Sequence, residues 1–185
     1  DSVISKMIIP EVQKGVLPSV DEVLDYTTKL IEKQLIFGKS KKHRLPRMSR
    51  AKVGDAYCAF YELEYDGGLS ETKLNRATDE IILSLKNLLN SGFFEEIIEA
   101  NPTILAQRQL SFKFWDEDVR VTCTPDMIVF FEKNPPMIVD WKVHYMANTD
   151  AWLQLGVYAV ALLNVKPHKD FPESFREIIK EPSDI

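Results

Sequence analysis

Two carboxylates and an amine are close in sequence where the chain has the pattern of a β-sheet. Asp126 begins one apolar run, Asp140 ends the next, and Lys142 follows Asp140 by two residues. In a hairpin the start of one strand lies beside the end of the next, so we expect both carboxylates at one end of a sheet, with Asp140 and Lys142 on one face. Clustered carboxylates attract a divalent cation, and oxygen ligands suit Mg²⁺ or Mn²⁺. Such a cluster is suited to phosphodiester hydrolysis, and a purely structural acid–base cluster is the alternative.

The elements that must position these residues are strands followed by a helix. Two runs alternate polar and apolar residues, as half-buried strands do, and two are continuously apolar, as strands covered on both faces are. The four predicted strands span residues 107–115, 119–124, 127–131 and 137–139. A helix then follows Asn148-Thr149-Asp150 and places Gln154 and Tyr158 one turn apart.

Helices are predicted before the strands. Ser19 with Glu22 three residues on forms a capping box, and the helical period continues to Gly38, a suitable residue just beyond a helix C-terminus. Further helices are predicted over residues 49–65, 71–90 and 173–180, with a short one ending at 99. We therefore expect an α/β (mixed α+β) fold in which helices flank a central mixed β-sheet. We expect a helix and basic loop over residues 1–48 and the main domain over 49–185, together forming one compact domain.

Composition narrows the class of protein and its partners. The chain has 185 residues, a net charge of −5 and two cysteines, Cys58 and Cys123, without a metal-binding spacing. It has no apolar segment of membrane-spanning length and no secretory signal pattern, so we expect an intracellular protein without membrane contact. Because no Met begins the chain, we expect a piece of a larger protein.

The charge distribution is uneven. Residues 39–52, here called the basic strip, carry seven positive charges and no acidic residue. The strip is a candidate for binding phosphates, and a solvated loop or a sorting signal is the alternative. Its basic residues are Lys39, Lys41, Lys42, Arg44, Arg47, Arg50 and Lys52.

Several motifs in this order resemble a known family. Thr124-Pro125-Asp126 followed by Asp140-Trp141-Lys142 resembles the signature of the PD-(D/E)XK nucleases, and residues 154–158, QLGVY, resemble the QxxxY element of their RecB-like branch. Residues 49–61 are similar to a helix of that branch. The resemblance covers roughly residues 49–163 and implies a restriction-endonuclease-like core.

The resemblance implies roles for individual residues. Asp126 and Asp140 would bind metal with a backbone carbonyl of Trp141 or Val143, and Lys142 would be catalytic. Gln154 and Tyr158 would face the active site and the nucleic-acid strand. The family's further metal ligand on an earlier helix would be Asp79 or Glu80. The cysteines that hold an iron–sulfur cluster in some relatives are missing, so no cluster is expected, and the strand that usually follows the QxxxY helix is hard to find.

The leading expectation is a divalent-metal-dependent DNA exonuclease acting on DNA ends or single strands. A helicase or polymerase domain is the expected partner in a full-length protein. One alternative is an RNA endonuclease of the viral cap-snatching type, which shares the TPD…DxK core. Another is a catalytically silent nuclease fold that binds nucleic acid or a protein. We expect Trp115, Trp141 and Trp152 to lie in the core rather than to stack on bases.

Overall fold

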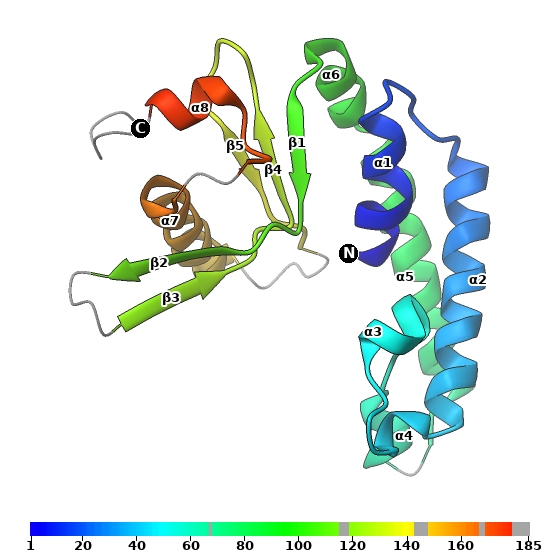
Figure 1. Ribbon diagram of the computed structural model, residues 1–185. Coiled ribbons are helices and arrows are strands. Elements are labelled where there is room, and N and C mark those ends of the chain that lie inside the picture. The colour runs from blue at the N-terminus through cyan, green and yellow to red at the C-terminus, as the bar shows by residue number, and fades with distance from the viewer. Residues whose placement is uncertain (67, 115–118, 143–147, 167–168, 179–185) are drawn as a thin grey trace. The chain divides into compact units, whose positions relative to one another are not determined.

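The computed structural model describes the chain except for residues 67, 115–118, 143–147, 167–168 and 179–185 (Figure 1). The chain divides into two compact units. The first consists of Asp1, Val3–Leu17 and Phe94–Ile185, and the second of Ser2 and Pro18–Phe93. The boundary predicted at residue 48 therefore falls inside the second unit, and the predicted domain over 49–185 takes residues from both units.

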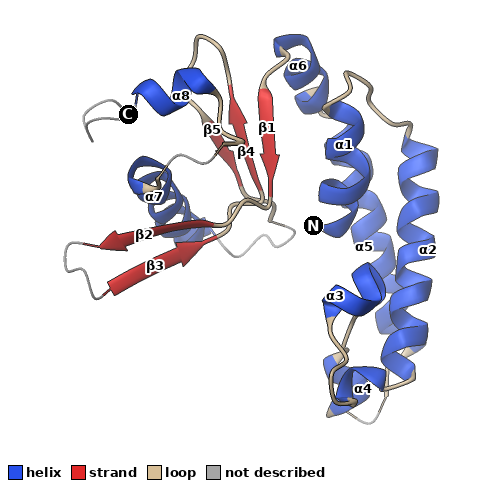
Figure 2. Cartoon of the chain, in the orientation of Figure 1, coloured by secondary structure: helices blue, strands red, loops and turns tan. Residues whose placement is uncertain are grey.

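The second unit is helical (Figure 2). Its long helices α2 (Val20–Lys39) and α5 (Glu71–Leu89) pack against each other. The predicted capping box of α2 is confirmed: the Glu22 amide donates to Ser19 Oγ at 3.3 Å, and the Ser19 amide donates to Glu22 Oε2 at 2.9 Å. The shorter elements of this unit are η2 (Lys42–Arg44), α3 (Arg50–Val53), η3 (Gly54–Ala56) and α4 (Tyr61–Glu64).

Two predictions in the second unit are wrong. The single helix over 49–65 is broken, because Gly54 adopts a φ of +72° after α3 and the chain runs extended before α4. Gly38 lies inside α2 rather than beyond its end. A Cβ at Gly38 would lie 2.6 Å from Cδ2 of Phe60, so this glycine allows a close approach instead of ending the helix.

The first unit holds all the described strands. It begins with the helical segments η1 (Ile4–Ile8) and α1 (Ile9–Val12), and α6 (Phe93–Ala100) leads into the strands. The strands pair antiparallel as β1-β4-β5 and as the hairpin β2-β3. They are β1 (Thr103–Ala106), β2 (Leu110–Phe114), β3 (Val119–Cys123), β4 (Met127–Phe130) and β5 (Met137–Val139). The predicted α/β class is confirmed, although the described strands form two small antiparallel sheets rather than one mixed sheet, and β1 was absent from the predicted strands.

The chain passes from one sheet to the other at two neighbouring points. Gln107, between β1 and β2, has a φ of +46°, and Asp126 lies between β3 and β4. The Gln107 amide donates to the Asp126 carbonyl at 2.9 Å, so the two crossings are bonded to each other. This hydrogen bond fixes the backbone of Asp126 at the start of β4.

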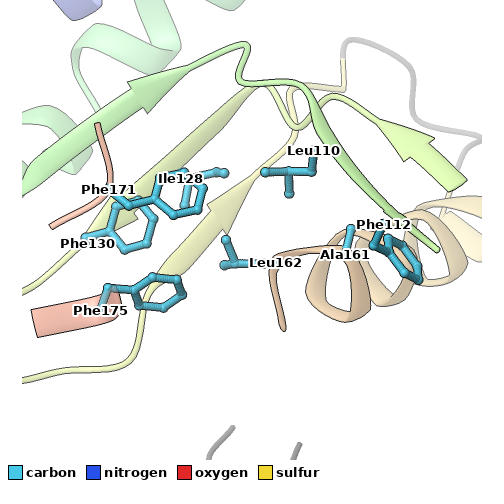
Figure 3. Packing of buried hydrophobic residues seen from close by; sticks show 8 residues of the cluster. All are labelled: Leu110, Phe112, Ile128, Phe130, Ala161, Leu162, Phe171 and Phe175. Atoms are coloured by element: carbon cyan, nitrogen blue, oxygen red, sulfur yellow. The ribbon is translucent and has the colours of Figure 1, made fainter. Parts of the chain in front are cut away.

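The core of the first unit lies where the sheets meet two helices, α7 (Asn148–Asn164) and α8 (Glu173–Ile178). Helix α7 packs against β2, β3 and β5. Each fully buried Leu, Ile or Phe contributes about 1.5–3 kcal/mol of transfer free energy, so this contact firmly determines where α7 lies. The cluster shown in Figure 3 consists of Leu110, Phe112, Ile128, Phe130, Ala161, Leu162, Phe171 and Phe175.

No helix in the described part of the chain is long and apolar enough to cross a membrane.

Candidate active site

Asp126 and Asp140 lie at the same end of the β4–β5 hairpin. Met127 pairs with Val139 in the register of the two strands, and each aspartate is the next residue outward from that pair. Pro125 is fully buried, which holds the bend directly before Asp126. The geometry expected of a hairpin therefore brings the two carboxylates to one edge, as alternation and register require.

The Asp126 carboxylate also ties the two strand ends together. Its Oδ2 accepts a hydrogen bond of 2.7 Å from the Trp141 amide, which leaves Oδ1 as the oxygen available to another ligand. The half-buried Trp141 ring packs against the buried Phe94, with ring centroids 6.3 Å apart. The segment after β5 is thus anchored on one side by a charge-assisted hydrogen bond and on the other by aromatic packing.

The expectation for the three tryptophans has mixed outcomes. Trp141 packs partly into the core as predicted. Trp152 does not, because 78% of its surface is exposed on α7. Trp115 lies outside the described residues.

Lys142 lies against Asp140. The two side chains form an ion pair, and Lys142 Nζ also donates to Gln154 Oε1 at 2.8 Å. Only 7% of the Asp140 side chain is exposed, against 38% of Lys142. The hydrogen bond from the ammonium group to Asp140 raises the pKa of Lys142 above its usual value, so the amine is protonated at neutral pH.

Gln154 connects the helix to the strand ends. Its Nε2 donates to Asp140 Oδ1 at 3.3 Å and to the Tyr158 hydroxyl oxygen at 2.5 Å. The amide orientation follows from its partners, since an ammonium group can only donate and a carboxylate can only accept. Tyr158 is 6% exposed, and burial raises the pKa of its phenol. Four of the five residues predicted as catalytic, Asp140, Lys142, Gln154 and Tyr158, therefore form one network of polar contacts. Asp126 joins it through the backbone amide of Trp141.

The donor set suits a small divalent cation. Asp126 and Asp140 offer hard oxygen ligands, and Mg²⁺ characteristically binds through one or two carboxylates while keeping several waters. Within the described ranges, no group of three or more His, Cys, Asp or Glu side chains is placed to hold a metal. The carbonyl ligand predicted at Trp141 stays a prediction, and the alternative, Val143, lies outside the described residues.

The predicted upstream ligands lie on the other unit. Asp79 and Glu80 are exposed on α5, and Glu80 accepts a hydrogen bond of 3.0 Å from Arg76 Nε. Their part in a metal site stays a prediction. So does the expected lack of an iron–sulfur cluster, and both Cys58 and Cys123 are free and half-buried.

All seven basic residues of the basic strip are exposed. Arg44 pairs with Glu64, and Arg50 lies 3.3 Å from Asp55 and 3.1 Å from Ser2 Oγ. Exposed cations of this density are compatible with the predicted phosphate contacts.

Residues outside the predicted site also gather at the strip, one of them, His43, from within it. His43, Tyr61, Glu64 and Tyr65 line one hollow of the second unit, and none of them is a predicted site residue. Two tyrosines spaced i, i+4 next to the strip are the sequence signal that points to them.

Comparison of this chain with protein-family models, curated proteins and solved structures finds no match. A proposal about function therefore depends on the side chains and their geometry.

Proposed function

We propose that this chain is a divalent-metal-dependent nuclease of the PD-(D/E)XK kind, close to the RecB-like branch, with a restriction-endonuclease-like core. It hydrolyses phosphodiester bonds of DNA as an exonuclease on DNA ends or single strands. The observation that carries the proposal is the network of Asp126, Asp140, Lys142, Gln154 and Tyr158, built from two strand ends and one helix face.

The two aspartates hold the metal in this proposal. Asp126 would contribute Oδ1, since its Oδ2 accepts the Trp141 amide, and Asp140 would contribute from the adjacent strand end. A bound Mg²⁺ or Mn²⁺ would polarise the scissile phosphate and lower the pKa of a bound water. Asp140 is largely buried, so its negative charge needs a compensating cation.

Lys142 acts as a cation in this proposal. The contact with Asp140 raises the pKa of Lys142, so the amine keeps its proton at neutral pH. Such a group stabilises the negative charge that develops on a phosphate during attack. It also compensates the Asp140 charge when no metal is bound.

Gln154 and Tyr158 position the charged groups. The Gln154 amide contacts both Lys142 and Asp140, so it sets the distance between the amine and the carboxylate. The Tyr158 oxygen accepts from Gln154, which leaves the phenol proton free to be donated toward a phosphate oxygen.

DNA is the proposed partner, and the basic strip is the proposed phosphate contact. The free cysteines Cys58 and Cys123 suit a reducing, intracellular compartment. A helicase or polymerase domain in a longer protein would supply the strand to be digested.

The test is a cleavage assay with labelled single-stranded DNA, duplex DNA and RNA, each with Mn²⁺, Mg²⁺ or EDTA. We expect metal-dependent cleavage of DNA, reduced at least about 100-fold in Asp140→Ala and Lys142→Ala. Glu132→Gln and Lys133→Ala are matched controls, because both residues are exposed on the turn between β4 and β5. Both should cleave as the wild type does.

The other outcomes separate the competing functions. Cleavage of RNA and not DNA would identify the RNA endonuclease. Absence of both metal-dependent cleavage and Mn²⁺ binding would refute the enzyme and favour a binding module.

A further inference from the structure

Two tyrosine rings stand exposed at α4, one at its first residue and one directly after its last, next to the basic strip. Tyr61 is 69% exposed and Tyr65 is 79% exposed. Their ring centroids lie 5.2 Å apart with an interplanar angle of 42°. Exposing a large aromatic ring to water is unfavourable, so two adjacent exposed rings spaced one helical turn apart are an unusual surface feature.

A hollow of about 580 Å³ opens beside these rings. His43 lines it with a side chain only 10% exposed, and Nδ1 of His43 has no hydrogen-bond partner within the described residues. Nε2 lies 3.0 Å from Glu64 Oε1 without the geometry of a hydrogen bond. Nε2 faces the Glu64 carboxylate, so Nδ1 is the ring nitrogen left without a contact, and a buried polar atom of this kind indicates a position that can meet a ligand.

The charges around the hollow favour an anion. Arg44 Nε donates to Glu64 Oε2 at 2.7 Å, and this contact lowers the pKa of the Glu64 carboxyl, so that acid is ionised and neutralised by its partner. Lys41, Lys42 and Arg47 are exposed in the adjoining strip. The nearby acids are Glu62 and Asp66, the latter 3.4 Å from Lys73. Lys41 also acts on the Glu64 carboxylate and lowers its pKa, so positive charge from the strip reaches the hollow.

We propose that this face of the second unit is a binding site for single-stranded nucleic acid. Unpaired bases stack on Tyr61 and Tyr65, a base edge reaches His43 in the hollow, and Lys41, Lys42 and Arg47 contact the phosphates. Aromatic rings beside a positive groove are the means by which proteins hold single strands without reading sequence. The proposal shares its nucleic-acid ligand with the proposed nuclease, and the binding itself does not require cleavage.

The surface selects single strands for a physical reason. In a duplex the faces of internal bases are already stacked on their neighbours, so only unpaired bases can stack on the two rings. The cations by themselves would bind duplex and single strand alike.

The test is fluorescence anisotropy in EDTA, where metal-dependent cleavage cannot occur. The probes are labelled oligo-dA, an abasic strand of the same length, an oligo-A RNA and a blunt duplex. We expect Tyr61→Ala with Tyr65→Ala to weaken oligo-dA binding at least about 30-fold, because two stacks of ~1–3 kcal/mol per base are lost. Binding of the abasic strand should not change, and the RNA arm establishes whether the site separates RNA from DNA.

The matched control keeps the rings. Tyr61→Phe with Tyr65→Phe should bind oligo-dA within about twofold of the wild type, because stacking needs the ring and not the hydroxyl. Both exposed residues can be replaced without opening the core, and circular dichroism checks that α4 and its neighbours are intact. Lys41→Glu with Lys42→Glu should weaken every probe and lower the salt slope by about two.

The outcome of this binding test can be distinguished from the outcome of the cleavage assay for the proposed nuclease. Tyr61→Ala with Tyr65→Ala leaves Asp126, Asp140 and Lys142 in place, so its binding in EDTA is read independently of the cleavage assay. Equal loss of oligo-dA and abasic binding in the alanine double variant would overturn the stacking site. So would unchanged oligo-dA binding, or a concentration-dependent self-association that the alanine variant abolishes.

Discussion

Asp126 has a structural contact and a proposed metal contact on different oxygens, so two substitutions can separate the roles. Oδ2 accepts the Trp141 amide at 2.7 Å, and Oδ1 is the proposed metal ligand. Asp126→Ala removes both contacts. Asp126→Asn keeps an oxygen that can accept the amide proton but loses the charge that a divalent cation needs.

The expected changes in Tm follow from the hydrogen bond between the Asp126 carboxylate and the Trp141 amide. A hydrogen bond to a charged group contributes about 1.5–3 kcal/mol, and Asp126→Ala leaves the Trp141 amide without this acceptor. For a chain of this size 1 kcal/mol corresponds to a shift of about 2–4 °C in Tm, so we expect Asp126→Ala to melt about 3–12 °C lower. Asp126→Asn relieves repulsion with Asp140 and should melt within about 2 °C of the wild type.

The assay is thermal unfolding with and without Mn²⁺. A cation at 100 times its Kd adds about 2.7 kcal/mol, which raises the wild-type Tm by about 5–11 °C. Neither variant should show that rise, and both should lose cleavage. If Asp126→Asn responds to Mn²⁺ as the wild type does, the carboxylate is not a metal ligand. If Asp126→Ala melts as the wild type does, the hydrogen bond to Trp141 does not hold the strand ends.

Three further outcomes test other parts of the structure. Tyr158→Phe removes the oxygen that accepts from Gln154, so kcat should fall several-fold with a stability loss of about 0.5–1.5 kcal/mol. Burial raises the pKa of the Tyr158 phenol above its usual 10.0. The stability that this group contributes is therefore complete below pH 10.0 and is lost as pH rises through the pKa of the folded state. Below pH 10.0, the free energy of unfolding of the wild type and of Tyr158→Phe should thus depend on pH in the same way. Gly38→Ala would place a Cβ 2.6 Å from the Phe60 ring, and we expect a loss of about 1–3 kcal/mol in chemical denaturation despite the better helix propensity of alanine; a gain in stability would contradict the close packing. Ser19→Ala should cost about 0.5–2 kcal/mol by removing the helix cap, whereas Ser19→Asn should retain most of it.

Much of the local structure was predictable because it depends on residues close in sequence. The capping box at Ser19 and the period of α5 are set by side chains within one turn of each other. The break at Gly54 was missed because a helical pattern of apolar residues continues across it, whereas the positive φ depends on how the flanking segments pack. Strand β1 was missed because its sequence, TILA, shows no alternation of polar and apolar residues, and its pairing with β4 joins residues distant in sequence.

The sequence by itself determined that Asp126 and Asp140 share one end of a hairpin and that Lys142 lies on the same face as Asp140. Strand alternation and antiparallel register depend only on spacing along the chain. Only the tertiary structure decided that the Gln154 amide joins Lys142 to Asp140, because packing of α7 on the strands sets which helix face meets the strand ends. It likewise decided that Trp152 is exposed and that two tyrosines stand beside the basic strip, since burial depends on residues distant in sequence.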